Sequence, residues 1–492
     1  MKEPVCLIIP PSGFLADAMV FMSIGPLKVA ASLEAKGHTV TVLDLSAIEN
    51  YCDAVADFVR THMVSIYGIS VTTPQAPSAK RITETIKSLR SEATVIWGGP
   101  HVTVTNAARK KEVKRGGVGR AHEAYGKLED IADILVSGDG EIAIFQAILP
   151  NAPKLIDGDD PDSELFLSEE QLGELPPPAR HLINMDGYHY YINGVRSASL
   201  IMQLGCSFGC RFCSGRLSPS FRRVRIRSID SVLREIESIY RDYNIKGYML
   251  YDDELNLSPS FISDLNAICD LQDRLGESFV FRGFLKSNLF NEEQAKAMKR
   301  ANFAEACVGF ESASPRILKN IKKQATVDQN TRCIEIAKKY GIRMKAFCSC
   351  GHPGDSAETI AATHDWLISV GIDDFDLSVI SPFPGTPYFD DAKQFSSDTW
   401  LYEVPENGDR LYMKNVDYTV VEEFYKGKID GGYHSHVYTD FLSQEDLVRM
   451  RDWAERGVRN KLNLPFYKTR AATLYDHSIG QLPSAVLMES PI

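Results

Sequence analysis

The segment Cys206-Ser207-Phe208-Gly209-Cys210-Arg211-Phe212-Cys213 places three cysteines within eight residues, at the spacing C-x3-C-x2-C. Thiolates are the ligands that iron–sulfur clusters use, and most [4Fe–4S] clusters take four of them. Three neighbouring cysteines therefore predict a [4Fe–4S] cluster bound by Cys206, Cys210 and Cys213, with the fourth iron open to another molecule. Gly209 lets the loop turn tightly around such a bulky group.

Two other readings of the cysteines are weaker. A disulfide is disfavoured because the rest of the chain has the features of an intracellular protein. Structural zinc normally takes a fourth Cys or His nearby, and no second C-x2-C or C-x-H pair follows. The apolar stretch 198–204 before the loop is typical of a strand that ends at Gly205, so the cysteines are expected just past a strand end, where α/β proteins bind ligands.

The composition limits the classes of protein to consider. The 492 residues predict two or three domains, and the 44% hydrophobic content is ordinary for a globular chain. The net charge of −11 disfavours general binding to nucleic acid or to anionic membranes. The other seven of the ten cysteines form no paired framework, and the start of the chain lacks the apolar core of a signal peptide. We therefore expect a cytoplasmic protein without membrane spans.

Residues 1–150 have the pattern of a doubly wound, Rossmann-like α/β domain. Short apolar runs alternate with helical patterns, as expected for buried parallel strands with helices on both faces. The basic, glycine-rich stretch 105–130 is predicted as a loop plus a weak helix. Residues 151–195 are predicted to be a linker that contains three consecutive prolines. The strands are expected at 5–9, 39–45, 64–71, 94–97 and 133–136.

Glycines follow two of these strands, as Gly98-Gly99-Pro100-His101 and as Gly138-Asp139-Gly140-Glu141. Backbone at such steps can approach a flat or phosphate-bearing ligand closely. Neither step is the dinucleotide fingerprint G-x-G-x-x-G, and on turn chemistry alone a glycine pair after a strand is more often a simple turn. Ligand contact and plain turns both remain open for them.

Residues 196–390 contain a second series of strands and helices, which predicts a partial (β/α)6 barrel with its chemistry at the carboxyl ends of the strands. Strands are expected at 199–203, 247–251, 279–285, 306–310, 344–350 and 375–380. Several strand ends carry polar residues or glycine that an apolar core does not need, and these are candidate ligand-binding positions weighed against structural capping. They are Asp252, Asp253, Glu254, Lys286, Glu311, Ser312 and Gly351.

Two further features of this region have both a structural and a functional reading. The five arginines of residues 216–227 are either a solvated turn or a clamp for carboxylate or phosphate, and Arg225 is the candidate to point into the site. Cys348 and Cys350 alternate on one strand and are more often buried thiols than a relay. Residues 391–492 are aromatic-rich, with a helix over 443–461, and are expected to close the barrel and shape a substrate pocket.

The cysteine spacing, with Phe212 before the last cysteine, resembles the signature of radical SAM enzymes. The Gly-Gly-x-His and Gly-x-Gly-Glu steps upstream resemble the cobalamin-binding domain of the cobalamin-dependent radical SAM subfamily, and the segment 174–180 resembles its linker. One departure is the lack of D-x-H-x-x-G, whose histidine ligates cobalt from below. His101 is the nearest alternative ligand, weighed against a polar or packing role.

The resemblance implies three cofactors: a [4Fe–4S] cluster, S-adenosylmethionine on its open iron, and cobalamin in residues 1–150. It implies methylation of an unactivated carbon, or of a phosphinate phosphorus, on a small organic substrate, with flavodoxin or ferredoxin as electron donor. Within the family, cyclisation or rearrangement without net methyl transfer is the alternative. A non-catalytic corrinoid or iron–sulfur carrier is a third reading, which the strand-end residues disfavour because a carrier needs no adenosyl site.

Overall fold

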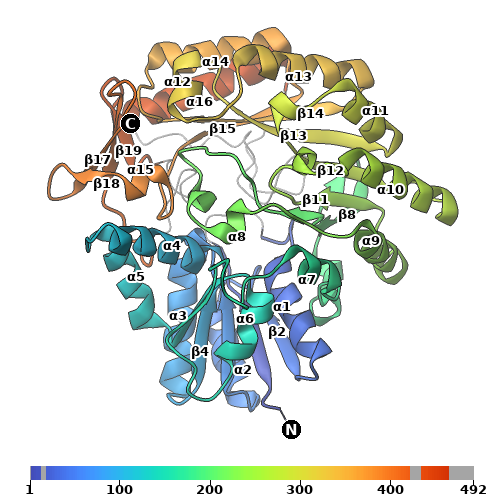
Figure 1. The fold of residues 1–492 in the computed structure, drawn as a ribbon, viewed down its shortest axis with the longest axis vertical. Coiled ribbons are helices and arrows are strands. Elements are labelled where there is room, and N and C mark those ends of the chain that lie inside the picture. The colour runs from blue at the N-terminus through green and yellow to red at the C-terminus, as the bar shows by residue number, and fades with distance from the viewer. Residues whose placement is uncertain (1, 13–17, 422–433, 465–492) are drawn as a thin grey trace.

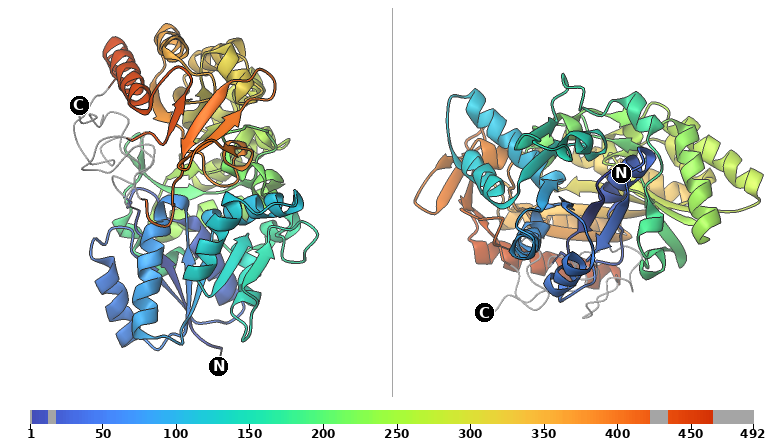
Figure 2. Two further views of the ribbon diagram at one scale, coloured as in Figure 1. Left: turned by 90° about the vertical axis from the view of Figure 1, so that its left-hand side faces the viewer. Right: turned by 90° about the horizontal axis from the view of Figure 1, so that it is seen from below.

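The computed structural model describes residues 2–12, 18–421 and 434–464. A doubly wound α/β domain forms one half of the molecule and a curved sheet with outer helices forms the other (Figure 1). A smaller four-stranded sheet lies at one side and reaches from the curved sheet towards the first domain (Figures 1 and 2). The predicted fold class, a Rossmann-like domain followed by a partial barrel, is confirmed.

The sheet of the first domain is entirely parallel, in the order β2-β1-β3-β4-β5-β6. Its strands are short apolar runs, and all five residues of β1 are buried, as is usual for strands covered on both faces. The order reverses between β1 and β3, where such sheets bind ligands. The strands are β1 (Val5–Ile9), β2 (Val40–Asp44), β3 (Ile66–Ser70), β4 (Thr94–Gly98), β5 (Ile134–Gly138) and β6 (Leu155–Gly158).

Helices cover both faces of this sheet. On one face α1 (Ile24–Ala35) and α6 (Gly140–Ala147) pack against it. On the other face lie α2 (Tyr51–Thr61), α3 (Ala76–Leu89) and α5 (Arg120–Ile131).

Two parts of the first domain differ from the prediction. The stretch predicted as a loop and a weak helix holds the end of α4 (Pro100–Lys114) and all but the last residue of α5, with a break only around Gly116–Gly119. Residues 101–108 of α4 are buried, so tertiary packing outweighs the weak helix propensity of their β-branched side chains. The strand β6 extends the sheet into residues that were assigned to the linker.

The rest of the linker joins the two halves closely. It contains the short helix α7 (Glu169–Glu174), and the Ala179 amide donates to the Leu27 carbonyl of α1. Arg180 is buried, pairs with Glu235 at 2.7 Å and donates to the Ser199 carbonyl of the second half at 2.9 Å. These contacts fix the first domain against the barrel.

The second half is the predicted six-stranded partial barrel, with β7 (Tyr191–Ile192) added antiparallel at one edge. Its parallel strands are β8 (Val195–Leu200), β11 (Gly247–Leu250), β12 (Val280–Leu285), β13 (Phe303–Glu311), β14 (Arg343–Cys350) and β15 (Asp374–Val379). The helices are α9 (Ile229–Tyr243), α10 (Phe261–Leu275), α11 (Glu292–Arg300), α12 (Pro315–Asn320), α13 (Val327–Tyr340) and α14 (Ala357–Val370). Cys348 and Cys350 lie in the core between sheet and helices, as the structural reading of these thiols expects.

The C-terminal region joins both halves. Its elements are α15 (Pro387–Asp390), β16 (Lys393–Gln394), β17 (Thr399–Glu403), β18 (Arg410–Lys414), β19 (Val437–Thr439) and α16 (Gln444–Leu462). Helix α16 packs beside α14 and over the edge strand β15, where Arg459 pairs with Asp374 at 3.1 Å. Phe389 packs on Ala108 and Ala121 of the first domain.

The turn at Gly385 lies between the two halves. Its φ is +86°, and a Cβ atom there would come within 2.6 Å of the Ser214 carbonyl oxygen and 3.0 Å of Val104 of α4. The prediction that residues 391–492 close the barrel stays a prediction, because 422–433 and 465–492, with Phe424, Tyr425 and Tyr433, lie outside the described residues.

Candidate functional site

The loop with the three cysteines is anchored where it begins. It leaves β9 (Gln203–Leu204), which pairs antiparallel with β10 (Arg225–Ile226). Gly205 has a φ of +89°, and a side chain there would clash with the Arg223 carbonyl. The Cys206 amide donates to the Phe221 carbonyl at 2.9 Å. The segment 221–225 therefore fixes the position of the first cysteine.

Two arginines hold the rest of this loop. The Arg211 amide donates to the Ile321 carbonyl at 2.9 Å, and its side chain donates to the Asn320 carbonyl at 3.0 Å and pairs with Glu406 at 2.5 Å. Arg222 donates to the Ser207 carbonyl at 2.9 Å and to the Phe208 carbonyl. Arg211 within the loop and Arg222 of the arginine-rich segment 216–227 thus both hold the loop against the surrounding chain.

The three thiols are free and lie near one another. None is in a disulfide, and each is close enough to the others to affect their ionisation. Burial raises the pKa of Cys206 to about 11. Among the described residues no three metal-ligating side chains converge on one point, whereas a [4Fe–4S] cluster binds each cysteine to a different iron. Cluster binding would therefore displace protons from these thiols.

Four charged side chains gather beside the cysteines; three lie at or just after the carboxyl ends of barrel strands and the fourth follows α12. Lys286 lies with its Nζ 4.4 Å from the Phe208 ring centroid and donates to the Lys323 carbonyl at 2.7 Å. Lys323 pairs with Glu311 at 3.1 Å. Burial raises the pKa of Glu254 to about 7 and lowers that of Lys286 to about 8. We call Glu254, Lys286, Glu311 and Lys323 the mouth cluster.

Glu311 is held in an unusual conformation. Its φ is +66°, in the left-handed region that most residues avoid, at an irregularity in the pairing of β13 with β14. Ser349 Oγ donates to Glu311 Oε2 at 2.7 Å. The His352 Nε2 lies 2.8 Å from the same hydroxyl, and its Nδ1 lies 3.3 Å from the Tyr388 hydroxyl. Such backbone strain is typical of functional positions.

Four further predicted site residues have partners within the protein, and ligand contact by them stays a prediction. Asp252 Oδ1 accepts hydrogen bonds from the Met202 and Gln203 amides, and Asp253 accepts one from Gly205 at 3.0 Å. Ser312 Oγ contacts Thr363 Oγ1 at 3.3 Å and accepts from the Ser314 amide at 3.1 Å. Gly351, at φ +86°, packs near Val437 and Leu447. These residues support the strand ends around the mouth cluster.

Sequence reasoning missed Lys323, the buried partner of Glu311. It follows the short helix α12, where Lys322 and Lys323 read as an ordinary basic helix end. Its side chain is 12 residues from Glu311 along the chain, so no local motif joins them.

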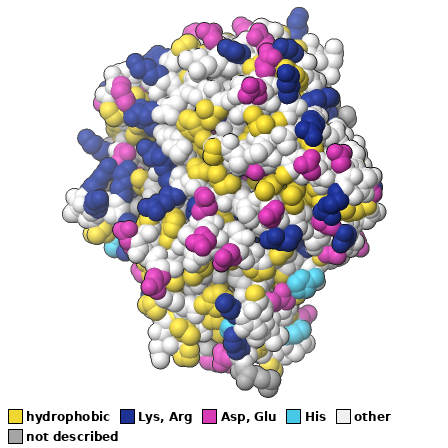
Figure 3. Space-filling model, turned by 45° about the vertical axis from the view of Figure 1, so that its right-hand side comes forward, with side chains coloured by type: hydrophobic (Ala, Val, Ile, Leu, Met, Phe, Trp, Pro, Cys, Tyr) yellow, Lys and Arg dark blue, Asp and Glu magenta, His cyan; other side chains and the backbone are white. Residues whose placement is uncertain are grey.

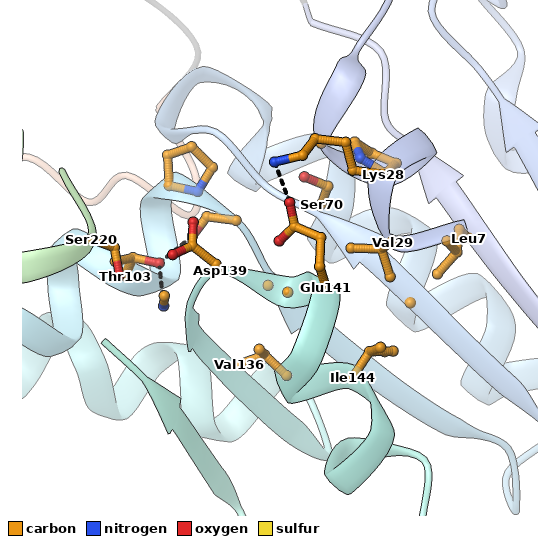
Figure 4. A pocket seen from close by; sticks show the side chains of 18 of the residues that line it. Leu7, Lys28, Val29, Ser70, Thr103, Val136, Asp139, Glu141, Ile144 and Ser220 are labelled. Atoms are coloured by element: carbon orange, nitrogen blue, oxygen red, sulfur yellow. Dashed lines mark hydrogen bonds and ion pairs between the residues drawn. The ribbon is translucent and has the colours of Figure 1, made fainter. Parts of the chain in front are cut away.

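A second site lies in the first domain, in a cavity of about 230 Å³ between α1 and α6 over the sheet (Figure 4). Five of the predicted residues line it, namely Gly98, Gly99, Gly138, Gly140 and Glu141. Its outer wall comes from the barrel half, through Ile201, Leu204, Ser220 and Phe221. Leu204 and Phe221 also flank the cysteine loop, so the cavity and the loop share a wall.

Charged pairs line this cavity. Lys28 of α1 pairs with Glu141 at the start of α6, as Figure 4 shows. Arg225 pairs with Asp139 at 2.5 Å and donates to the Leu167 and Ser220 carbonyls. In the structure the partner of Arg225 is a protein carboxylate, and ligand contact by Arg225 stays a prediction. Lys28 and Asp139 were missed because their partners are far along the chain.

Two of the glycines that line the cavity, Gly138 and Gly99, stand where a side chain would clash with a neighbouring strand or turn. Gly138 has a φ of +88°, and a side chain there would clash with the Gly158 backbone of β6. Gly99 has a φ of +92°, and a Cβ atom would lie 2.9 Å from the Val71 amide nitrogen. Both let the turns run close to neighbouring strands, and both leave backbone facing the cavity. A mostly apolar slot edged by backbone amides and hydroxyls fits part of a large corrinoid.

His101 lies outside the set of residues that line the cavity. Its side chain is buried, its Nδ1 lies 3.1 Å from Thr73 Oγ1, and burial lowers its pKa to about 4. The contacts favour a packing role.

Comparisons with known proteins agree with this pair of sites. Residues 200–367 match the profile of the radical SAM superfamily, and residues 18–129 match that of the B12 binding domain. The chain therefore contains a radical SAM domain and, ahead of it, a B12-binding domain, as the resemblance predicted.

Two relatives and one solved structure extend over most of the chain. An uncharacterized methyltransferase of Pyrococcus horikoshii is 27% identical over 78% of this chain and 81% of its own length. The anaerobic magnesium-protoporphyrin IX monomethyl ester cyclase of Rubrivivax gelatinosus is 23% identical over 77% and 68%. The radical S-adenosylmethionine methyltransferase TsrM from Kitasatospora setae, solved with cobalamin and a [4Fe–4S] cluster bound, has the same fold, with a TM-score of 0.61 and 18% identity over 79% and 77%. None of the described helices has the length and apolar character needed to cross a membrane.

Proposed function

We propose that this protein is a cobalamin-dependent radical SAM methyltransferase that methylates an unactivated carbon, or a phosphinate phosphorus, of a small organic molecule. The observation that carries the proposal is the wall shared by the two sites. Leu204 and Phe221 line the cavity of the B12-binding domain and flank the loop of Cys206. A corrinoid in the cavity and a cluster on the loop would therefore be neighbours.

The residues divide the work as follows. Cys206, Cys210 and Cys213 hold the cluster through their thiolates. When bound, the cluster supplies the electron that starts radical chemistry on S-adenosylmethionine, and cobalamin carries the methyl group.

The mouth cluster binds S-adenosylmethionine beside the open iron. Glu311, fixed by Lys323 and Ser349, accepts hydrogen bonds from the ligand's ammonium or hydroxyl groups. Lys286 lies near Glu254, has a pKa lowered to about 8 by burial, and in its protonated form can pair with the ligand's carboxylate. The glycine turns at Gly98–Gly99 and Gly138–Gly140 let the corrinoid approach the backbone.

The partners follow from this chemistry. An electron donor such as flavodoxin or ferredoxin reduces the cluster, and the protein works in the cytoplasm on a small molecule without nucleic acid or membrane. On the face shown in Figure 3, acidic and basic side chains are both distributed across the surface.

A cyclase or rearrangement enzyme without net methyl transfer is the second candidate. The cyclase of Rubrivivax gelatinosus is similar to this protein over most of the chain. Similarity of this kind is therefore compatible with cyclisation as well as with methyl transfer.

The test is anaerobic turnover of the reconstituted protein with methyl-labelled S-adenosylmethionine and candidate metabolites, followed by product mass. A product that carries the label supports methyl transfer, and an unlabelled rearranged product supports the second candidate.

Replacing Cys206, Cys210 and Cys213 together by Ala should remove the cluster absorbance and all formation of 5′-deoxyadenosine. Retention of about four irons per chain in that variant would contradict the cluster assignment. Wild-type protein that loads both cofactors and forms no 5′-deoxyadenosine would indicate a carrier.

A further inference from the structure

The inner face of the barrel is built in layers. The layer nearest the amino ends of the strands is ionic: Arg282 pairs with Glu305 at 2.6 Å, and Lys345 pairs with Asp374 at 3.2 Å and with Asp376 at 3.1 Å. Arg282 and Glu305 are register partners, as are Lys345 and Asp374, so the pairs run across adjacent strands. We call these five residues the ionic floor.

Aromatic rings occupy the next layer. Phe284 and Phe347 lie two residues beyond Arg282 and Lys345 on the same strands and therefore on the same face. Their ring centroids are 5.7 Å apart, and Tyr251 lies 6.2 Å from Phe284. Phe21, which comes from the first domain just before α1, lies 5.8 Å from Tyr251. These four residues form the aromatic layer.

The rings of the aromatic layer are only partly buried. The Tyr251 residue is 47% exposed, and Phe21, Phe284 and Phe347 are half-buried. Their strand neighbours Leu285 and Ala346 point the other way and are buried in the core against the helices. Accessible aromatic rings on a concave face, with charges engaged beneath them, are typical of a ligand site.

The layer lies directly below the mouth cluster. Lys286 and Ser349 follow Phe284 and Phe347 by two residues on the same face. A group that rests on the rings therefore reaches the level of Glu311, where the proposed function puts S-adenosylmethionine.

The chemistry of the layer selects its occupant. The charges of the ionic floor are engaged with each other, so the hollow favours a neutral guest. The interplanar angles are 46° between Phe21 and Tyr251, 83° between Tyr251 and Phe284, and 36° between Phe284 and Phe347. The layer therefore presents both ring faces and ring edges, and an aromatic ligand can stack on the faces and pack against the edges in a way that an aliphatic ligand cannot.

We infer that the aromatic layer binds a neutral aromatic ring of the substrate and holds the position to be modified towards the mouth. This inference rests on the proposed function and adds the substrate class to it. Because Phe21 comes from the first domain and the other three rings come from the barrel, both domains contribute residues to the layer.

The test uses the full-length protein loaded with cluster and corrinoid, and indole as the neutral aromatic probe. Saturation-transfer NMR titrations compare indole with cyclohexanol and with the anion 1-naphthalenesulfonate. We expect indole to bind best, and Phe284→Ala and Phe347→Ala each to weaken it by about two- to tenfold, the range of one aromatic contact. The matched control is Phe395→Ala, since Phe395 is 59% exposed in the C-terminal region and lies outside the layer.

Phe284→Leu serves as a second variant if the alanine variant loses its cluster absorbance, because leucine keeps most of the volume and removes the ring. Equal indole affinity in the wild type and in the layer variants would overturn the inference, and so would preference for cyclohexanol or for the anion. Reductive cleavage of S-adenosylmethionine without substrate is measured on the same samples. Loss of that cleavage in the wild type with intact indole binding would contradict the proposed function and leave the aromatic site standing.

Discussion

Ser349 Oγ donates its hydrogen bond to Glu311 Oε2 at 2.7 Å, and this assigns the direction of a longer chain of contacts. Because the hydroxyl has one proton, it accepts from His352 Nε2, which lies 2.8 Å away. The other ring nitrogen then accepts from the Tyr388 hydroxyl at 3.3 Å. Burial lowers the pKa of His352 to about 4, so the ring is neutral at pH 7. All three donors therefore point towards the Glu311 carboxylate and orient it.

Glu311→Gln tests that carboxylate as a ligand. A charge-assisted hydrogen bond contributes roughly 1.5–3 kcal/mol, so the dissociation constant for S-adenosylmethionine should rise about ten- to a hundredfold while the cluster still forms. Calorimetry with cluster-loaded protein measures it. Glu292→Gln is the control, because Glu292 also pairs with a lysine, Lys339 at 2.7 Å, but on the surface. Unchanged affinity with a lowered melting temperature would make Glu311 a structural residue.

Asp252 gives a prediction about stability. Its Oδ1 accepts the Met202 amide at 2.9 Å and also the Gln203 amide, and burial raises its pKa to about 8, so it is neutral at pH 7. Asp252→Asn should therefore melt near the wild type. Asp252→Ala leaves two buried amides unpaired and should lose about 2–4 kcal/mol. Thermal unfolding measures both, with Asp186→Ala as an exposed control. Equal melting of all the variants would contradict this role.

Asp390 gives a prediction about pH. Its Oδ1 accepts the Gly385 amide at 3.1 Å, Oδ2 has no hydrogen-bond partner among the described residues, and burial raises its pKa to about 7. The unfolded chain releases this proton near pH 4. Between about pH 4 and 7 the folded state binds the proton more tightly, so its stabilising contribution is full below that window and is lost as the pH rises through it. Above about pH 7 the contribution stays constant.

Asp390→Asn should remove this dependence. The difference in melting temperature between wild type and variant, measured from pH 4.5 to 8, should therefore change in favour of the variant as the pH rises. A difference that is constant with pH would show that Asp390 ionises normally in the folded protein.

His101→Ala tests the axial ligand of cobalt. The His101 side chain contacts Thr73 and does not line the cavity, so the variant should bind about one corrinoid with an unchanged cobalt spectrum. Electron paramagnetic resonance of the reduced, loaded protein is the measurement, with Thr73→Val to report on packing alone. Loss of nitrogen hyperfine splitting in His101→Ala would make His101 a ligand.

The sequence was informative where local pattern decides structure. Apolar runs such as Val5–Ile9 are strands because both faces are buried, and the cysteine spacing defines a loop by itself. It was uninformative for α4, whose β-branched first turns are helical only because they are buried between other elements. Short β6 had the same difficulty, since four residues give little periodicity.

The site divides in the same way. Asp252 and Glu254 are two residues apart, yet the first is tied to backbone amides and the second belongs to the mouth cluster. The two side chains have different surroundings because the chain turns after β11, and that turn cannot be read from the local sequence. The pairs Arg225–Asp139 and Lys323–Glu311 depend on the fold, because 86 and 12 residues separate their members.

The turn at Gly385 has a consequence for how the protein is made. It touches both Val104 of α4 and Ser214 next to the last cysteine, yet it follows them by more than 170 residues in synthesis. A ribosome therefore synthesises the B12-binding domain and the three cysteines well before this turn exists. The growing chain passes through a stage in which the linker and the Arg225–Asp139 pair can already join the two halves, while the contact of Gly385 with Val104 and Ser214 can form only later.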